Sequence, residues 1–331
     1  MNTHIELETS GKPLDTVQDL LVQLWQDVNL NHMLLPIKDG ERPAWRKKDI
    51  SSADELALSN PFTPIMVENI AQFVPAFIDA HPGEKLAVLL RPCEMRAMIK
   101  IMQTLQLNTE NILFISADCL GTYPQEEFSW RASRKGSQEN LSEDALRFAR
   151  QGGIAAYRYR AACQLCENPI AEMGDININI VGLPVRQKML VSLLNSKAKQ
   201  MGFLVQETGE MHENLLLQHK LTAEKLIYRN QQTKQRLSEV LVENTNLEIE
   251  SLVDQLNECG ECTTCMDVCP ICSTYNLSKD MDGNISREIV ADWMISCVGC
   301  GMCEQSCSQH KPLAVIFSII NDQLAELNTI D

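Results

Sequence analysis

Three absences narrow the classes of protein to which this 331-residue sequence can belong. No apolar run approaches the roughly 20 residues that cross a bilayer, because the longest, residues 313–320, is interrupted by Ser318. Neither GxGxxG nor GxxxxGK(S/T) occurs, so no motif predicts a dinucleotide or P-loop nucleotide site. Basic residues are scarce, since 29 Lys and Arg stand against 44 Asp and Glu, a net charge of −15. We therefore expect no membrane span. We also expect no nucleic-acid partner, because the phosphates of a nucleic acid must be neutralised by cations.

Cysteine, by contrast, is abundant, and its distribution predicts metal binding. The chain has 13 cysteines, of which nine lie between Cys259 and Cys307. An odd number in a chain of this length fits a disulfide scaffold poorly, whereas clustered thiols in a reducing compartment are typical of metal sites. Residues 1–16 are polar and acidic and lack the features of a secretory signal. The sequence therefore predicts a cytoplasmic metalloprotein.

Apolar runs bounded by turn residues predict an α/β (or α+β) fold with a mixed sheet in the N-terminal part. We expect strands at residues 86–90, 112–115, 154–159 and 176–181, and helices at residues 95–105 and 186–201. Residues 124–151 are polar and are interpreted as a solvated loop with a helix after Asn140. Residues 210–256 carry a long helical pattern rich in Leu, Glu, Gln and Lys, which predicts a helical connector.

The most specific motif is a cysteine run that occurs twice. Cys259-x-x-Cys262-x-x-Cys265-x-x-x-Cys269-Pro270 is followed by Cys297-x-x-Cys300-x-x-Cys303-x-x-x-Cys307. The first run matches the bacterial ferredoxin pattern, including the proline. Three closely spaced thiolates can cap three irons of a cube, and in two-cluster ferredoxins the fourth cysteine of each run ligates the other cluster. The spacing therefore assigns one [4Fe–4S] cluster to Cys259, Cys262, Cys265 and Cys307, and another to Cys297, Cys300, Cys303 and Cys269.

Structural zinc is the alternative for these cysteines, but it usually takes two separated CxxC or CxxH pairs. Ser308 stands where a proline usually follows the fourth cysteine, a mild departure that leaves Cys307 as a ligand. Cys272 has no place in this scheme and is interpreted as a buried, inert thiol. Residues 285–295, between the two runs, have helical periodicity. This favours an α-helical ferredoxin domain, of the kind found in heterodisulfide reductase and fumarate reductase iron–sulfur subunits, over the compact βαβ ferredoxin.

The other four cysteines either follow predicted strands or form a CxxC pair. Cys93 comes just after residues 86–90, Cys119 comes just after residues 112–115, and Cys163 and Cys166 are the pair. Loops at the carboxyl ends of neighbouring strands converge in an open α/β sheet. These four thiols could therefore hold a third [4Fe–4S] cluster. A redox CxxC and unrelated buried thiols are open alternatives from the residues alone.

The same four cysteines carry a resemblance to a known family. Pro92-Cys93, Cys119-Leu120-Gly121 and Cys163-x-x-Cys166 followed by Gly174-Asp175-Ile176 resemble the beta subunit of the coenzyme F-420-reducing hydrogenase and of related formate dehydrogenases. The resemblance covers about residues 50–205, with the tandem motif appended as in some formate dehydrogenase beta subunits. It implies that Cys93, Cys119, Cys163 and Cys166 hold a [4Fe–4S] cluster beside an FAD.

The resemblance divides the chain into four parts and also places the flavin. The parts are an N-terminal helical segment (1–50), a flavin/[4Fe–4S] domain (51–206), a helical connector (207–256) and a ferredoxin-type domain with two [4Fe–4S] clusters (257–331). Many members of the family carry a Ser/Gly-rich flavin loop before the first cysteine, whereas residues 58–64 here have no Gly pair. The implied flavin contacts fall on Ser59, Asn60, Thr63, Arg91 and Arg96. A turn residue or a surface cation is the alternative at each position.

Together these patterns predict an iron–sulfur electron-transfer subunit of an oxidoreductase complex. It would relay electrons through FAD and three [4Fe–4S] clusters between a catalytic subunit and an acceptor. The resemblance implies a formate dehydrogenase or hydrogenase catalytic subunit, and a heterodisulfide-reductase-like protein or ferredoxin as acceptor. The alternatives are a flavin-free relay with two or three clusters and a non-redox protein with structural metal. No catalytic residue is predicted, and the six histidines form no pair at metal-binding spacing.

Overall fold

The computed structural model describes residues 3–38, 45–153, 158–203, 213–242, 248–275, 277 and 279–327. Its N-terminal part is built on a seven-stranded mixed sheet of order β1-β7-β6-β5-β4-β2-β3. The strands are β1 (Thr3–Glu8), β2 (His32–Lys38), β3 (Trp45–Ile50), β4 (Leu86–Leu90), β5 (Ile112–Ala117), β6 (Ile176–Asn179) and β7 (Lys188–Leu193). Strands β2, β4, β5 and β6 pair in parallel, while β3 and β7 pair antiparallel with their neighbours. The parallel centre places the carboxyl ends of β4 and β5 side by side.

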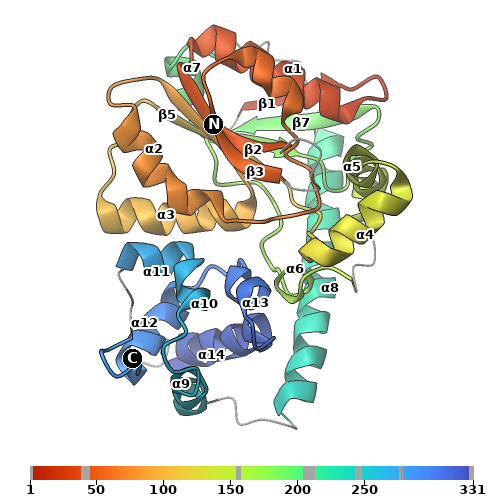
Figure 1. Ribbon diagram of the computed structural model, residues 1–331. Helices are drawn as coiled ribbons and strands as arrows, with labels where there is room; N and C mark the ends of the chain where they lie inside the picture. Colours follow the sequence, from red (N-terminus) through yellow and green to blue (C-terminus); the bar gives the residue numbers. More distant parts are fainter. Residues whose placement is uncertain are drawn as a thin grey trace.

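Helices cover both faces of this sheet (Figure 1). Leu89 of β4 belongs to one apolar core with α1, and its neighbour Val88 belongs to another with α2 and α3. Successive strand residues point to opposite faces, so the fully buried strands β4 and β5 serve both cores. The elements of this part are α1 (Pro13–Val28), η1 (Ala53–Leu58), η2 (Ile70–Phe73), α2 (Val74–Ala80), α3 (Pro92–Leu105), α4 (Gln125–Lys135), α5 (Gln138–Arg147), η3 (Ala149–Gln151), α6 (Ala161–Gln164) and α7 (Lys197–Gln200).

The remaining elements are helices, and α8 runs along one side of both parts of the molecule (Figure 1). They are α8 (Glu213–Val242), α9 (Ile249–Asn257), α10 (Thr264–Asp267), α11 (Pro270–Tyr275), α12 (Arg287–Ser296), α13 (Met302–Ser306) and α14 (Leu313–Leu327). Helices α9 to α14 share a core of their own, in which Trp293 contacts Phe317 edge to face. Among the described helices, none is long and apolar enough to cross a membrane.

Several predicted elements are confirmed. The strands predicted at residues 86–90 and 112–115 are β4 and β5, and β6 occupies part of residues 176–181. The helix predicted at residues 95–105 is part of α3. The helical pattern of residues 210–256 is present as α8 and α9. The strand expected at 154–159 lies largely outside the described residues, and Arg158 and Tyr159 are not in a strand.

Three expectations about local structure are wrong. The helix predicted at residues 186–201 is strand β7 followed by the short helix α7, because a short apolar run cannot be distinguished from a buried strand by periodicity. Residues 124–151 hold helices α4 and α5 where a loop was expected before Asn140; their polar residues form exposed faces around a few buried side chains such as Phe128. Residues 3–50 include β1, β2 and β3 in addition to α1, and so belong to the sheet and are not a separate helical segment.

Candidate iron–sulfur centres

The four scattered cysteines meet at the carboxyl ends of the parallel strands. Cys93 lies in the first turn of α3, directly after β4, and Cys119 follows β5. Cys163 lies in α6 and Cys166 just beyond it. All four line one cavity. Because β4 and β5 pair in parallel, the loops after them adjoin, as expected for ligand sites of open α/β sheets. We call these four residues the sheet set.

The turn that presents Cys93 is shaped by its neighbours. Pro92 stands at the first helical position, where its missing N–H costs nothing and its fixed φ suits the helix. The buried carboxylate of Glu94 accepts hydrogen bonds from the backbone N–H of Arg91 at 2.7 Å and of Ile70 at 3.1 Å. Burial raises the pKa of Glu94, while Arg91 and these two bonds oppose the rise. The strand-to-helix turn therefore has its amide groups satisfied and holds Cys93 in place.

Asp118 performs the same task for Cys119. Its buried carboxylate accepts hydrogen bonds from the backbone N–H groups of Ala171 (2.8 Å), Ile180 (2.8 Å) and Val181 (3.0 Å). These bonds tie the loop after β5 to the segments after Cys166 and after β6. The sequence analysis missed this residue, although an acidic residue directly before a strand-end cysteine is a usable signal.

The four cysteines of the sheet set are half-buried, and their thiols are close enough to affect one another's pKa. Burial raises the pKa of Cys119 to about 12, and the charge of Cys163 adds to the rise. Burial, then Glu94, then Cys119 raise the pKa of Cys93. Four thiolates gathered here without a cation would repel one another in a desolvated space. Iron offers the compensating positive charge, because a metal deprotonates the thiols that coordinate it. The donor set therefore fits a [4Fe–4S] cluster.

Arg160 is a buried cation beside the sheet set. Its guanidinium donates to Thr122 Oγ1 at 2.8 Å and to Gln305 Oε1 at 3.2 Å, and Nη2 lies 3.7 Å from Cys163 Sγ. Burial raises the pKa of Cys163, but Arg160 and a hydrogen bond with Thr122 outweigh it, so that the pKa is lowered. The sequence analysis missed Arg160 as well, since nothing but its place three residues before Cys163 marks it.

The tandem cysteines lie in two neighbouring groups, and their assignment to two clusters stays a prediction. Cys259, Cys262, Cys265 and Cys307 line a cavity of about 340 Å³. Burial raises the pKa of Cys265 to about 11, and the charges of the other three thiols add to it. In the second group, burial and then the charges of Cys297, Cys300 and Cys269 raise the pKa of Cys303. We call the first group the outer set and the second the middle set.

The middle set lies between the other two. Cys300 lines the cavity of the sheet set, and its charge contributes to the raised pKa of Cys93 after burial, Glu94 and Cys119. On the other side, the charge of Cys265 in the outer set is among the causes, behind burial, of the raised pKa of Cys303. The middle set therefore adjoins both the sheet set and the outer set.

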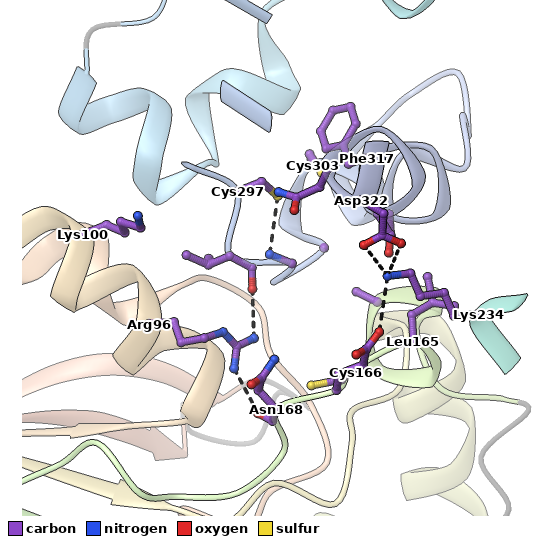
Figure 2. A pocket seen from close by; sticks show the side chains of 18 of the residues that line it. Arg96, Lys100, Leu165, Cys166, Asn168, Lys234, Cys297, Cys303, Phe317 and Asp322 are labelled. Atoms are coloured by element: carbon purple, nitrogen blue, oxygen red, sulfur yellow. Dashed lines mark hydrogen bonds and ion pairs between the residues drawn. The ribbon is translucent and has the colours of Figure 1, made fainter. Parts of the chain in front are cut away.

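Direct contacts hold the sheet set and the middle set together across the two parts of the chain. Arg96 on α3 donates to the backbone oxygen of Asn168 at 3.0 Å and of Val298 at 2.9 Å (Figure 2). Gly301, with φ +69°, packs so closely that a Cβ there would lie 2.3 Å from the Cβ of Ala162. The loop that carries Cys300 thus lies against the helix that carries Cys163.

Cys272, the thirteenth cysteine, is buried as expected, with 2% of its surface exposed. The neighbouring Cys272 is the first of the causes that lower the pKa of Cys269 to about 6. Cys269 and burial in turn raise the pKa of Cys272. Cys272 therefore lies where its S–H group can donate to the sulfur of Cys269 in the middle set. All thirteen cysteines are free thiols.

Most of the residues implied as flavin contacts are engaged inside the protein. Ser59 Oγ donates to the backbone oxygen of Leu56 at 2.7 Å, and Asn60 Nδ2 donates to Ser142 Oγ at 2.9 Å. Arg91 donates to the backbone oxygens of Thr63 and Ile65 at 3.1 and 2.6 Å.

Of the other two implied residues, Arg96 also donates to backbone oxygens, and only Thr63 lacks such a partner. The buried hydroxyl of Thr63 has no hydrogen-bond partner. Arg96 lines a 470 Å³ cleft between the two parts of the chain, together with Cys166 and Cys297 (Figure 2). The structure thus brings Arg96 to the thiols and keeps Ser59 and Asn60 in a buried turn.

Comparison with known proteins places this geometry in context. No family model matches the chain. It is 24% identical over 219 residues to the F420-dependent formate dehydrogenase 1 subunit beta of Methanococcus maripaludis, a match that covers 57% of this chain and 54% of that protein. It is 22% identical over 275 residues to the F420-dependent formate dehydrogenase subunit beta of Methanocaldococcus jannaschii, covering 71% and 70%. The chain thus spans about half the length of the first of these relatives.

A chain of the F420-reducing [NiFe] hydrogenase complex from Methanosarcina barkeri is a structural neighbour, with a TM-score of 0.47 and 11% identity over 71% of this chain and 91% of that one. The two sequence matches support the resemblance that the cysteine pattern carries, and the chain is similar in sequence to F420-dependent formate dehydrogenase beta subunits.

Proposed function

We propose that this protein is the iron–sulfur electron-transfer subunit of an oxidoreductase complex, holding three [4Fe–4S] clusters in a row. The observation that carries the proposal is the arrangement of twelve thiols in three adjoining groups of four. Each cluster, when bound, supplies a site that takes up and releases one electron. The sheet set would hold one cluster on the α/β part, and the middle and outer sets would hold the two of a helical ferredoxin domain (257–331).

The residues around the thiols suit a relay better than a catalytic site. Arg160 and Met302, which lie between the sheet and middle sets, are buried, so their side of the space between these two centres is shielded from water, while the cleft lined by Cys166 and Cys297 opens on another side. The rigid loops around Glu94 and Asp118 keep the ligands of the sheet set from moving when charge arrives. Exclusion of water and a fixed ligand geometry both lower the reorganisation that accompanies a change of charge.

The names of the relatives suggest the partners. Both are subunits of F420-dependent formate dehydrogenases, so we infer that a formate dehydrogenase or hydrogenase catalytic subunit supplies or receives the electrons. A heterodisulfide-reductase-like protein or a ferredoxin is the proposed acceptor. A cytoplasmic location stays a prediction from the thirteen free thiols.

A flavin would decide whether this subunit can exchange hydride. Clusters carry single electrons, whereas a deazaflavin or nicotinamide carries a hydride, and a flavin joins the two kinds of transfer. FAD therefore stays part of the proposal as the family resemblance implies it. The second candidate is a flavin-free relay between one-electron partners, favoured by the internal hydrogen bonds of Ser59, Asn60 and Arg91.

Anaerobic purification followed by iron, sulfide and visible absorption measurements tests the proposal. Three clusters require about 12 irons per chain, and Cys163→Ala should reduce this to about 8 without disturbing the tandem sets. Cys272→Ala is the matched control, because it removes a buried thiol that is not assigned as a ligand, and it should keep all the iron. Flavin bands over the cluster absorption would favour the subunit that contains FAD. Cluster absorption without flavin bands would favour the flavin-free relay. If Cys163→Ala has the same iron content as the native protein, the sheet set is not a cluster site. If the native protein contains no iron and no sulfide, the proposed electron-transfer function is refuted.

A further inference from the structure

Two histidines that lie far apart in the sequence are stacked where strands β2 and β4 begin. This is the end of the parallel strands remote from the thiols. His32 begins β2, and His81 follows the end of α2. Their ring centroids are 3.7 Å apart with an interplanar angle of 27°. Asp49 on β3 and Glu84, in the turn before β4, flank the pair. The spacing of the histidines in the sequence is not that of a metal motif, and only the fold brings these two together.

Asp49 fixes how both rings are oriented. Its carboxylate lies 2.8 Å from His32 Nδ1 and 2.8 Å from His81 Nε2, one oxygen to each ring. A carboxylate accepts hydrogen bonds only, so each of these nitrogens carries the proton. The other nitrogen of each neutral ring then presents a lone pair. A carboxylate that orients histidines in this way is the usual partner of metal-binding imidazoles.

The two lone pairs face Glu84. Its Oε2 lies 3.4 Å from His32 Nε2 and 4.0 Å from His81 Nδ1, too far for strong hydrogen bonds. One ligand atom from each of His32, His81 and Glu84 lies within 4.8 Å of the other two. Ligands about 2.0–2.1 Å from a tetrahedral zinc ion are roughly 3.3 Å apart. Binding would therefore draw the three atoms together and turn the two rings out of their stacked arrangement until both lone pairs point at the ion.

The charge of the cluster also favours a cation. Two carboxylates, Asp49 and Glu84, contact the two imidazoles, and carboxylates attract a cation. Among the described residues, the ion pairs of Asp49 and Glu84 are with these two histidines only. The side chains of His32 and His81 are 22% and 15% exposed, so an ion can enter from solvent.

We propose that His32 Nε2, His81 Nδ1 and a Glu84 oxygen bind a divalent cation, best matched by Zn²⁺, with Asp49 as the positioning residue for both imidazoles. Two histidines and one carboxylate with an open fourth position form a known zinc ligand set. The site lies where β2 and β4 begin, whereas Cys93 and Cys119 follow the ends of β4 and β5. It is therefore a site separate from the thiol sets, and an ion there would join β2 to the turn between α2 and β4.

Zinc retention by the iron-loaded protein tests the site. The holoprotein is washed with a chelator, incubated anaerobically with one equivalent of Zn²⁺, gel-filtered and analysed for zinc and iron. The native chain should keep about one zinc, with nitrogen and oxygen neighbours at about 2.0–2.1 Å and no sulfur at about 2.3 Å in X-ray absorption. His81→Gln and Glu84→Gln should lose the zinc and keep the iron. Asp49→Asn, which leaves all three ligands, should weaken zinc binding about 10- to 100-fold.

The matched control is His4→Gln, which removes a histidine from the opposite edge of the sheet, where it bonds Ser192. It should retain zinc like the native chain. Zinc retained equally by Glu84→Gln and Asp49→Asn, a sulfur shell around the zinc, or no zinc retained by the native holoprotein would each overturn the proposal. If His81→Gln fails to fold, the Glu84 and Asp49 variants decide the question alone.

Discussion

Replacing Arg160 by Gln should lower the reduction potentials of the centres at the sheet and middle sets. Arg160 is a buried cation with 6% of its surface exposed, and within the described part of the chain its side chain donates to hydroxyl, amide and sulfur atoms and to no carboxylate. Burial lowers the pKa of the guanidinium, but the charges of Cys163, Cys93 and Cys300 outweigh burial and raise it. Cys163 and Cys93 belong to the sheet set and Cys300 belongs to the middle set, so the cation stabilises negative charge at both sets. Each reduction adds one negative charge, and this is the state that Arg160 favours.

The magnitude follows from the distance. Arg160 Nη2 lies 3.7 Å from Cys163 Sγ, and the added electron resides on iron roughly 2–3 Å beyond that sulfur, a separation of roughly 6–7 Å. At an effective dielectric constant of about 20, unit charges at this distance interact by about 2.5 kcal/mol. For a one-electron couple this corresponds to a shift of roughly 100 mV toward lower potential. The outer set is farther away and should shift much less.

Redox titration followed by electron paramagnetic resonance measures this shift centre by centre. Arg160→Lys keeps the charge and should retain most of the potential, while Arg186→Gln, an exposed arginine beside Gly11, is the matched control for net charge. Iron content is determined first, so that loss of a cluster is not mistaken for a shift. The reasoning is refuted if Arg160→Gln keeps all its iron and its potentials equal those of Arg186→Gln.

Two further predictions concern the middle set. Cys272→Ala removes the S–H donor to Cys269 and should lower the potential of the middle centre by roughly 40 mV, for a bond of about 1 kcal/mol; Cys272→Ser should restore it, and a rise in potential would contradict the assigned direction. Gly301→Ala places a Cβ 2.3 Å from that of Ala162 and should destabilise the protein by about 1–3 kcal/mol and slow electron transfer between the sheet and middle centres. Gly299 also has a positive φ, but a Cβ there would meet nothing within 4 Å, so Gly299→Ala is the control. If both variants lose the same stability in chemical denaturation and are slowed equally in stopped-flow reduction, the contact with Ala162 is irrelevant.

The thiol sets could be predicted from the sequence because their geometry is encoded locally. The spacing from Cys259 to Cys265 limits three thiols to one short loop, and the fourth position follows from the known exchange between ferredoxin runs. The sheet set required one more rule, that loops after neighbouring parallel strands meet, and this rule placed Cys93 beside Cys119. Neither rule says how the sets are placed relative to one another. The relative placement of the sheet and middle sets depends on the contact of Gly301 with Ala162 and on the hydrogen bond from Arg96 to Val298. Both contacts join segments that are distant in the sequence, and neither leaves a periodic pattern in it.

The errors share a physical cause. The run Lys188–Leu193 is apolar enough for either a buried helix or a buried strand, and only pairing with β1 and β6 selects the strand. Histidine spacing failed in the same way. His32 and His81 cannot meet along one helix or hairpin, yet they stack because β2 and β4 begin side by side in the sheet. Spacing rules detect sites built by one segment, and a site built by two strands requires the topology first. The predicted zinc site is therefore also a test of the sheet order, because a register that separated β2 from β4 would leave no shared ligand position for zinc to occupy.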